Sequence, residues 1–173
     1  MARNTEIKAR IASVEALLPL AIAVADGGPP QLIAQDDTFF QTPQGRLKLR
    51  EFADGSAELI HYHRADAEGP KVSDYVISTV PDPASMRLAL TRANGLLGRV
   101  RKQRTLLLTG ATRIHLDRVE GLGDFLELEV VLRDEQSVDD GERIAHALMG
   151  ELGLRAEQLL SGAYLDLLQT QQR

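Results

Sequence analysis

The chain has 173 residues, of which 43% are hydrophobic and 26% are charged, a composition typical of one soluble globular domain over residues 1–173. It contains no cysteine, which excludes disulfides and thiolate metal sites and fits a cytoplasmic protein. With a net charge of −5 and no long apolar run, we expect neither nucleic acid nor a membrane as a partner. The composition leaves a homodimer open.

The first half of the chain predicts mainly strands. A strand over residues 2–10 precedes a helix over 12–25, which Ser13 caps and the Gly-Gly-Pro-Pro sequence at 27–30 ends. Four strands follow, over residues 31–41, 45–53, 57–65 and 71–80. The turn residues between the first three of these strands indicate hairpins, and therefore antiparallel pairing.

The second half repeats this arrangement. A helix is expected over residues 84–97, up to Gly98, and three strands over 99–108, 111–120 and 124–133. From about residue 137 the apolar spacing predicts helices that pack on the sheet. The resulting class is α+β, with about eight strands in an antiparallel sheet.

Charged residues lie two apart in several of these strands, and side chains two apart share a face of a strand. These faces hold eight Lys or Arg against four Asp or Glu, in a chain that is acidic as a whole. A solvated sheet face is the simpler interpretation. A cationic surface with carboxylates also suits a polyanion held with a divalent metal. Closing the sheet into a barrel would remove its edges and turn these faces into a wet tunnel.

Three stretches are specific enough to compare with a family. Residues 4–10 read Asn-Thr-Glu-Ile-Lys-Ala-Arg, residues 45–50 read Gly-Arg-Leu-Lys-Leu-Arg, and residues 113–129 begin Arg-Ile-His-Leu-Asp and end Glu-Leu-Glu. With residues 69–75, they resemble CYTH-domain proteins of the triphosphate tunnel metalloenzyme superfamily, in the branch grouped with class IV adenylate cyclases. The resemblance covers nearly the whole chain. Asn4 stands where the family signature Glu-x-Glu-x-Lys has its first Glu.

The resemblance implies an eight-stranded antiparallel β-barrel or tunnel that binds a triphosphate along its cations and Mg²⁺ or Mn²⁺ on its carboxylates. The residues expected to bind the metal are Glu6, Asp117, Glu127 and Glu129. The residues expected to bind phosphate oxygens are Lys8, Arg46, Lys48, Arg50, Arg64, Lys71, Lys102, Arg104 and Arg113. Lys8 has a second interpretation, because neighbouring cations would favour a neutral amine that could act as the catalytic general base.

These residues favour a metal-dependent triphosphatase, in which water attacks the terminal phosphorus of an inorganic or organic triphosphate. The alternative is an adenylate cyclase that makes cyclic AMP and pyrophosphate from ATP, to which the closest motif resemblance points. A second alternative is a non-catalytic module that binds polyphosphate or a nucleotide, which the loss of one carboxylate at Asn4 would permit.

Overall fold

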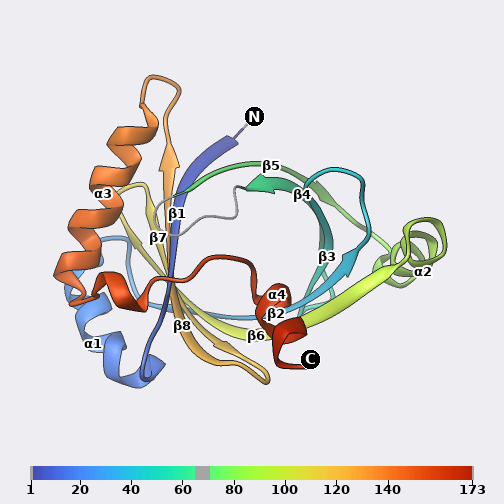
Figure 1. The fold of residues 1–173 in the computed structure, drawn as a ribbon, viewed down its shortest axis with the longest axis horizontal. Helices are drawn as coiled ribbons and strands as arrows, with labels where there is room; N and C mark the ends of the chain where they lie inside the picture. Colours follow the sequence, from blue (N-terminus) through green and yellow to red (C-terminus); the bar gives the residue numbers. More distant parts are fainter. Residues whose placement is uncertain (1, 65–70, 173) are drawn as a thin grey trace.

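The alternating strands form a closed antiparallel barrel with helices packed outside it (Figure 1). The computed structural model describes residues 2–64 and 71–172, without the side chains of Ala2, Arg64, Lys71 and Val72. The strand order around the barrel is β1-β5-β4-β3-β2-β6-β7-β8, and β8 pairs with β1 to close it. The expected fold class is confirmed.

The strands are β1 (Ala2–Arg10), β2 (Gln31–Phe40), β3 (Arg46–Phe52), β4 (Ala57–Arg64), β5 (Lys71–Thr79), β6 (Leu96–Thr109), β7 (Thr112–Val119) and β8 (Gly123–Leu132). The helices are α1 (Val14–Val24), α2 (Pro83–Asn94), α3 (Val138–Glu151) and α4 (Tyr164–Gln171), with a 3₁₀ turn over Ala156–Gln158. Among the described residues, no helix has the length and apolar character needed to cross a membrane.

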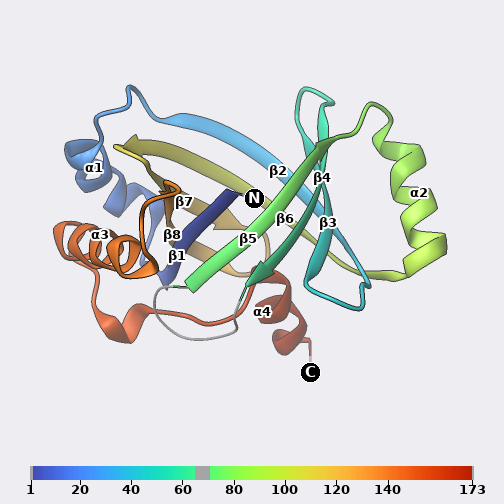
Figure 2. The same cartoon turned by 90° about the horizontal axis from the view of Figure 1, so that it is seen from above.

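The largest hydrophobic cluster lies outside the barrel, between its wall and two helices. In β1, Ile7 and Ala9 point outward and pack in one cluster with residues of α1 and α3, such as Ala21 and Leu148. Figure 2 shows α1 and α3 side by side on this flank, with α2 at the opposite flank of the barrel. Because α1 and α3 cover the apolar faces of the strands on this flank, the charged faces of these strands turn inward.

Helix α2 ends earlier than the sequence predicts. Asp82 caps its start by accepting a hydrogen bond from the Ser85 amide, and Gly95 ends it with a φ of 90°, a conformation that favours glycine. Strand β6 therefore begins at Leu96. Gly98, the predicted end of the helix, lies within β6, where a Cβ atom would come 2.7 Å from the side chain of Leu165. Gly98 thus permits the close approach of α4.

Candidate active site

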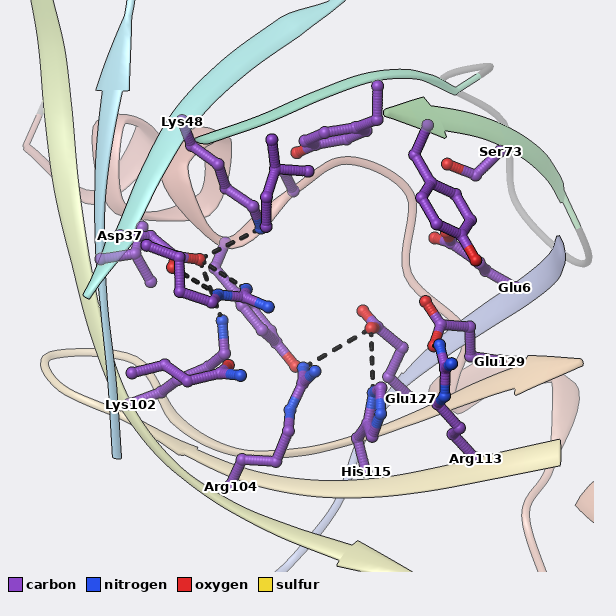
Figure 3. Close-up of a pocket in the computed structure, with 18 of the residues that line it drawn as sticks. Glu6, Asp37, Lys48, Ser73, Lys102, Arg104, Arg113, His115, Glu127 and Glu129 are labelled. Atoms are coloured by element: carbon purple, nitrogen blue, oxygen red, sulfur yellow. Dashed lines mark hydrogen bonds and ion pairs between the residues drawn. The ribbon is translucent and has the colours of Figure 1, made fainter. Parts of the chain in front are cut away.

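The barrel encloses a cavity of about 320 Å³. All eight strands line it, because every strand turns alternate side chains inward, and Tyr164 at the start of α4 also lines it. Figure 3 shows these side chains converging on the cavity from the surrounding strands. The charged and imidazole side chains in the lining are Glu6, Lys8, Asp37, Lys48, Arg50, Glu58, Lys102, Arg104, Arg113, His115, Glu127 and Glu129.

One wall of the cavity gathers three cations around a single carboxylate. Asp37 accepts hydrogen bonds from Lys48 Nζ at 3.1 Å, Arg50 Nε at 2.7 Å and Lys102 Nζ at 3.3 Å. Burial would raise the pKa of Asp37, but the charges of Arg50, Lys102 and Lys48 outweigh it and hold that pKa well below its ordinary value. This wall carries more positive than negative charge.

The two lysines of this wall lose protons easily. Burial lowers the pKa of Lys48 to about 8, with repulsion from Arg50 adding to the effect. Burial also lowers the pKa of Lys102 to about 7, although the Asp37 carboxylate opposes this shift. A polyanion entering the cavity would favour the charged form of both lysines.

The opposite wall carries two carboxylates on neighbouring strands. Glu6 on β1 lies directly across from Glu129 on β8, and both side chains line the cavity. Glu129 accepts a hydrogen bond from Arg113 Nη1 at 2.9 Å. Figure 3 places Glu6 and Glu129 across the cavity from Asp37. Positive and negative side chains are therefore separated across the cavity, with excess cations on one side and acidic oxygens on the other.

Glu127 lies between these two walls and is surrounded by donors. Its carboxylate lies 3.5 Å from Lys8 Nζ, 3.6 Å from Arg104 Nη2 and 3.3 Å from His115 Nδ1. Burial would raise the pKa of Glu127, but these neighbours, led by Lys8, hold it well below its ordinary value. Burial and the charge of Arg104 lower the pKa of His115, which favours the neutral imidazole.

Asp117 does not line the cavity. Its carboxylate accepts two hydrogen bonds from Arg104, at 2.7 and 2.6 Å, and one from the Tyr164 hydroxyl at 2.8 Å. The side chain has no exposed surface. Asp117 therefore holds Arg104 and Tyr164 in place from behind the lining, which differs from its predicted role as a metal ligand.

Lys8 has neighbours that attract a positive charge. Its Nζ lies 3.5 Å from Glu127 Oε2, 3.3 Å from the carbonyl oxygen of Gly162 and 4.0 Å from the centroid of the Tyr164 ring. The sequence pattern had predicted repelling cations around this amine. An ammonium group in these surroundings supports the phosphate-contact interpretation of Lys8 over the general-base interpretation.

The C-terminal segment covers one end of the cavity. Ala163 and Tyr164 belong to the lining, and Arg46 forms two hydrogen bonds, of 3.1 and 2.6 Å, with the carboxylate of Asp166 in α4. Arg46 was predicted to bind phosphate, but it does not line the cavity and instead holds this segment. Within the first turn of α4, the sequence therefore supplies both a lining ring and an anchoring carboxylate.

The structure brings most predicted site residues together. Those that line the cavity are Glu6, Lys8, Lys48, Arg50, Lys102, Arg104, Arg113, Glu127 and Glu129. The side chains of Arg64 and Lys71 lie outside the described part of the chain. Asp37 was missed, because the adjacent Asp36 and Asp37 give no sign in the sequence of which one faces inward.

The donor set for a divalent metal is smaller than predicted. Among the described residues, no three His, Asp or Glu side chains are grouped closely enough to hold a metal ion. Mg²⁺ in phosphate-binding sites is usually held by one or two carboxylates, with substrate phosphates completing the set. Glu6 and Glu129 meet this smaller requirement. Beside them, Asn4 lines the cavity with both side-chain polar atoms buried and unpartnered within the described structure, so one further oxygen donor is available.

Comparisons with known proteins place these features in a family context. The family model for the CYTH domain matches residues 2–164. Adenylate cyclase CyaB of Aeromonas hydrophila is 27% identical over 176 residues, which cover 95% of this chain and 87% of that protein.

Two solved structures show the same fold. Protein PH1012 of Pyrococcus horikoshii OT3 has a TM-score of 0.82 at 24% identity, over 95% of this chain and 98% of that one. The adenylyl cyclase homologue HpAC1 of Hippeastrum, whose structure is described as revealing a dominant triphosphatase activity, has a TM-score of 0.69 at 15% identity. That match covers 99% of this chain and 96% of that one.

Proposed function

Because this chain belongs to the CYTH domain family, we propose that it is a divalent-metal-dependent phosphohydrolase acting on a triphosphate bound in the tunnel. The observation that carries the proposal is the division of charge across the cavity. Lys48 and Lys102 lie on one wall, across from Glu6 and Glu129 (Figure 3). Arg50 joins the first wall through its hydrogen bonds to Asp37. A triphosphate chelating a metal ion has this same division, with free phosphate oxygens at one side and a cation at the other.

Four cations of the lining have distinct roles in this proposal. Arg50 and Arg104 offer planar forks that match two phosphate oxygens, whereas Lys48 and Lys102 act as point charges. The two arginines are held by Asp37 and Asp117, respectively, before substrate arrives. Such fixed cations stabilise the charge of a transferring phosphoryl group without reorganising during the reaction.

Glu6 and Glu129 would hold Mg²⁺ or Mn²⁺, with the Asn4 side chain as a neutral neighbour. When bound, the ion supplies Lewis-acid stabilisation of phosphate charge. Arg113, which donates to Glu129, orients that carboxylate in the free protein. Water is the nucleophile in this proposal, and tripolyphosphate yields pyrophosphate and orthophosphate.

Replacing a charge on either wall tests the proposal. Glu129→Ala and Lys48→Ala are each expected to reduce orthophosphate release from tripolyphosphate at least a hundredfold, with the circular dichroism spectrum unchanged. Matched controls are Glu135→Ala, whose carboxylate is 72% exposed, and Arg101→Ala on the outer face of β6. Full activity in both tunnel variants would overturn the assignment.

An adenylate cyclase is the second candidate, and the apolar part of the lining favours it. Ile33, Phe52, Ile60 and Ile77 line the same cavity as the charged groups, so an organic group attached to the phosphates has a surface to contact. The relative from Aeromonas hydrophila also carries this name. Formation of cyclic AMP and pyrophosphate from ATP would establish this activity, whereas orthophosphate alone would exclude it under the conditions used.

A further inference from the structure

The Asp37 carboxylate is surrounded by cations in the middle of the tunnel wall. Asp37 lies opposite Arg50 on β3 and is 1% exposed. All ion pairs of Lys48, Arg50 and Lys102 within the described structure go to this one carboxylate. Three cations, of which Lys102 is buried and Lys48 and Arg50 are partly buried, thus share one counter-charge.

A purely structural role does not explain a ratio of three cations to one carboxylate. Burying a charge costs several kcal/mol unless a partner compensates it, so a cluster that serves stability alone is expected to pair its charges one to one. When both lysines are protonated, this cluster instead carries three positive charges and one negative charge. The excess indicates that a second anion completes the cluster.

The cations also keep unused hydrogen-bonding capacity. An ammonium group has three N–H donors and a guanidinium has five. Lys48 and Lys102 each use one donor on Asp37, and Arg50 uses two. About seven donors therefore remain for oxygens that enter the cavity.

We propose that Asp37 is a positioning residue of the phosphate site, whose carboxylate holds Lys48, Arg50 and Lys102 together and charged until phosphate oxygens occupy their remaining donors. This inference rests on the proposed function, because it assigns the cluster to a polyphosphate. Asp37 occupies the place of one anion among the cations, so the site is formed before the substrate enters.

The charges around Lys102 make the role measurable. Asp37, on β2, favours its ammonium form, while burial and the charges of Lys48 and Arg50 on β3 and Arg104 on β6 oppose it. Asp117 on β7 is a further carboxylate near this amine, and the Tyr164 ring lies 5.6 Å from its Nζ. Removing the charge of Asp37 therefore shifts the loss of the Lys102 proton to lower pH.

The test is the binding of inorganic tripolyphosphate without divalent metal, measured by calorimetry from pH 6 to 9 in wild type and Asp37→Asn. At pH 6, the lowest pH of the series, protonation of the lysines is most favoured in both proteins, so we expect the smallest difference in affinity there, about threefold or about 0.7 kcal/mol. At pH 8, we expect Asp37→Asn to bind at least tenfold more weakly. Asp37→Glu, which keeps the charge, is expected to restore much of the wild-type pH profile.

Asp36→Asn is the matched control. Asp36 is the adjacent residue of β2, but it faces outward and pairs with Arg99 and Arg101 at the surface. The tripolyphosphate affinity of Asp36→Asn is expected to depend on pH as that of the wild type does. If Asp37→Asn does not fold, the same measurement compares Lys102→Gln with the double variant Lys102→Gln/Asp37→Asn. In that pair Lys48 is the lysine whose proton loss, read from the pH dependence of tripolyphosphate affinity, is expected to shift to lower pH.

An unchanged pH profile in folded Asp37→Asn would overturn the inference, even if the protein hydrolyses tripolyphosphate. Conversely, a protein that binds tripolyphosphate with the expected profile but releases no orthophosphate would support the inference while contradicting the proposed function. Absence of tripolyphosphate binding by the wild-type protein would overturn both.

Discussion

Arg104 donates two hydrogen bonds to Asp117, from Nε to Oδ1 at 2.7 Å and from Nη2 to Oδ2 at 2.6 Å. Both side chains are buried, and Tyr164 donates a third hydrogen bond to the same carboxylate. Asp117 therefore connects a cation of the tunnel wall with the C-terminal segment that covers one end of the cavity. Asp117 holds Arg104 and Tyr164, so its loss is expected to lower stability, whereas the loss of a metal ligand would lower metal affinity.

Asp117→Asn is expected to lower the free energy of unfolding by about 3 kcal/mol, because it removes the charge of the carboxylate that accepts two hydrogen bonds from the buried Arg104 guanidinium. Urea denaturation measures this change. The control Glu135→Gln removes a carboxylate that is 72% exposed and is expected to change stability by less than about 0.5 kcal/mol. Unchanged stability together with lost Mn²⁺ binding would instead identify Asp117 as a metal ligand.

The free energy of unfolding is expected to rise with pH between about 7 and 9. The pKa of Lys102 is about 7 and that of Lys48 about 8 in the folded protein, chiefly because both amines are buried. The unfolded chain, with ordinary lysines, then binds more protons across this range. Below pH 7 both lysines are charged in both states, so this stabilisation is lost.

The expected gain is on the order of 3 kcal/mol, measured by urea denaturation at pH 7, 8 and 9. Lys102→Gln should reduce the slope, since one of the two titrating groups is removed. Saturating tripolyphosphate should also reduce it by keeping both lysines charged. A free energy of unfolding that is flat or falls over this range in the free protein would contradict the prediction.

Asn4→Asp is expected to raise the affinity for Mn²⁺ about tenfold, equivalent to about 1.4 kcal/mol. Asn4 shares the inner face of β1 with Glu6, and its buried amide has no partner within the described structure. A carboxylate there adds negative charge beside Glu6 and Glu129, which strengthens a site built from oxygen donors. Electron paramagnetic resonance of free Mn²⁺ measures the affinity without requiring turnover.

The control for this substitution is Asn94→Asp, which adds the same charge at the exposed end of α2. It is expected to leave Mn²⁺ affinity unchanged. Equal effects of the two substitutions would show that overall charge, and not a site at Asn4, determines the binding of the ion.

Asp166→Asn is expected to loosen the C-terminal segment while the barrel keeps its stability. The carboxylate of Asp166 binds Arg46 through two hydrogen bonds, but the two side chains are 39% and 24% exposed, so the global effect is expected to be below about 1 kcal/mol. Hydrogen exchange should become at least fivefold faster in α4 and remain unchanged in β7 and β8. Equal exchange in α4 of both proteins would show that Arg46 does not hold the segment.

Period-two alternation in the sequence predicted all eight strands, because every strand turns alternate side chains into the cavity and many of the charged residues recur at that spacing. The end of α2 was less predictable. Gly95 and Gly98 are both plausible ends for a helix from the sequence alone. In the structure Gly95 takes the positive φ that ends α2, and Gly98 lies in β6, where Leu165 packs against it.

The candidate site was predictable in its residue types and less so in its pairings. Asp37 was missed because β2 carries two adjacent aspartates, and strand register decides which one faces the tunnel. Asp117 and Arg46 were placed correctly on charged faces, yet each is held by a partner that comes from a distant part of the chain. Alternation shows which face a side chain occupies, but not what covers that face.

The most direct test of the proposed function is phosphorus NMR of the products formed by the purified protein from tripolyphosphate and from ATP, each with Mg²⁺ or Mn²⁺. The division of charge across the tunnel predicts orthophosphate and pyrophosphate from tripolyphosphate, at a rate that Glu129→Ala abolishes. Pyrophosphate with cyclic AMP from ATP, and no orthophosphate from either substrate, would contradict the hydrolase and establish the cyclase. No product from either substrate at any metal concentration would contradict both activities, and tripolyphosphate binding without turnover would then identify a binding protein.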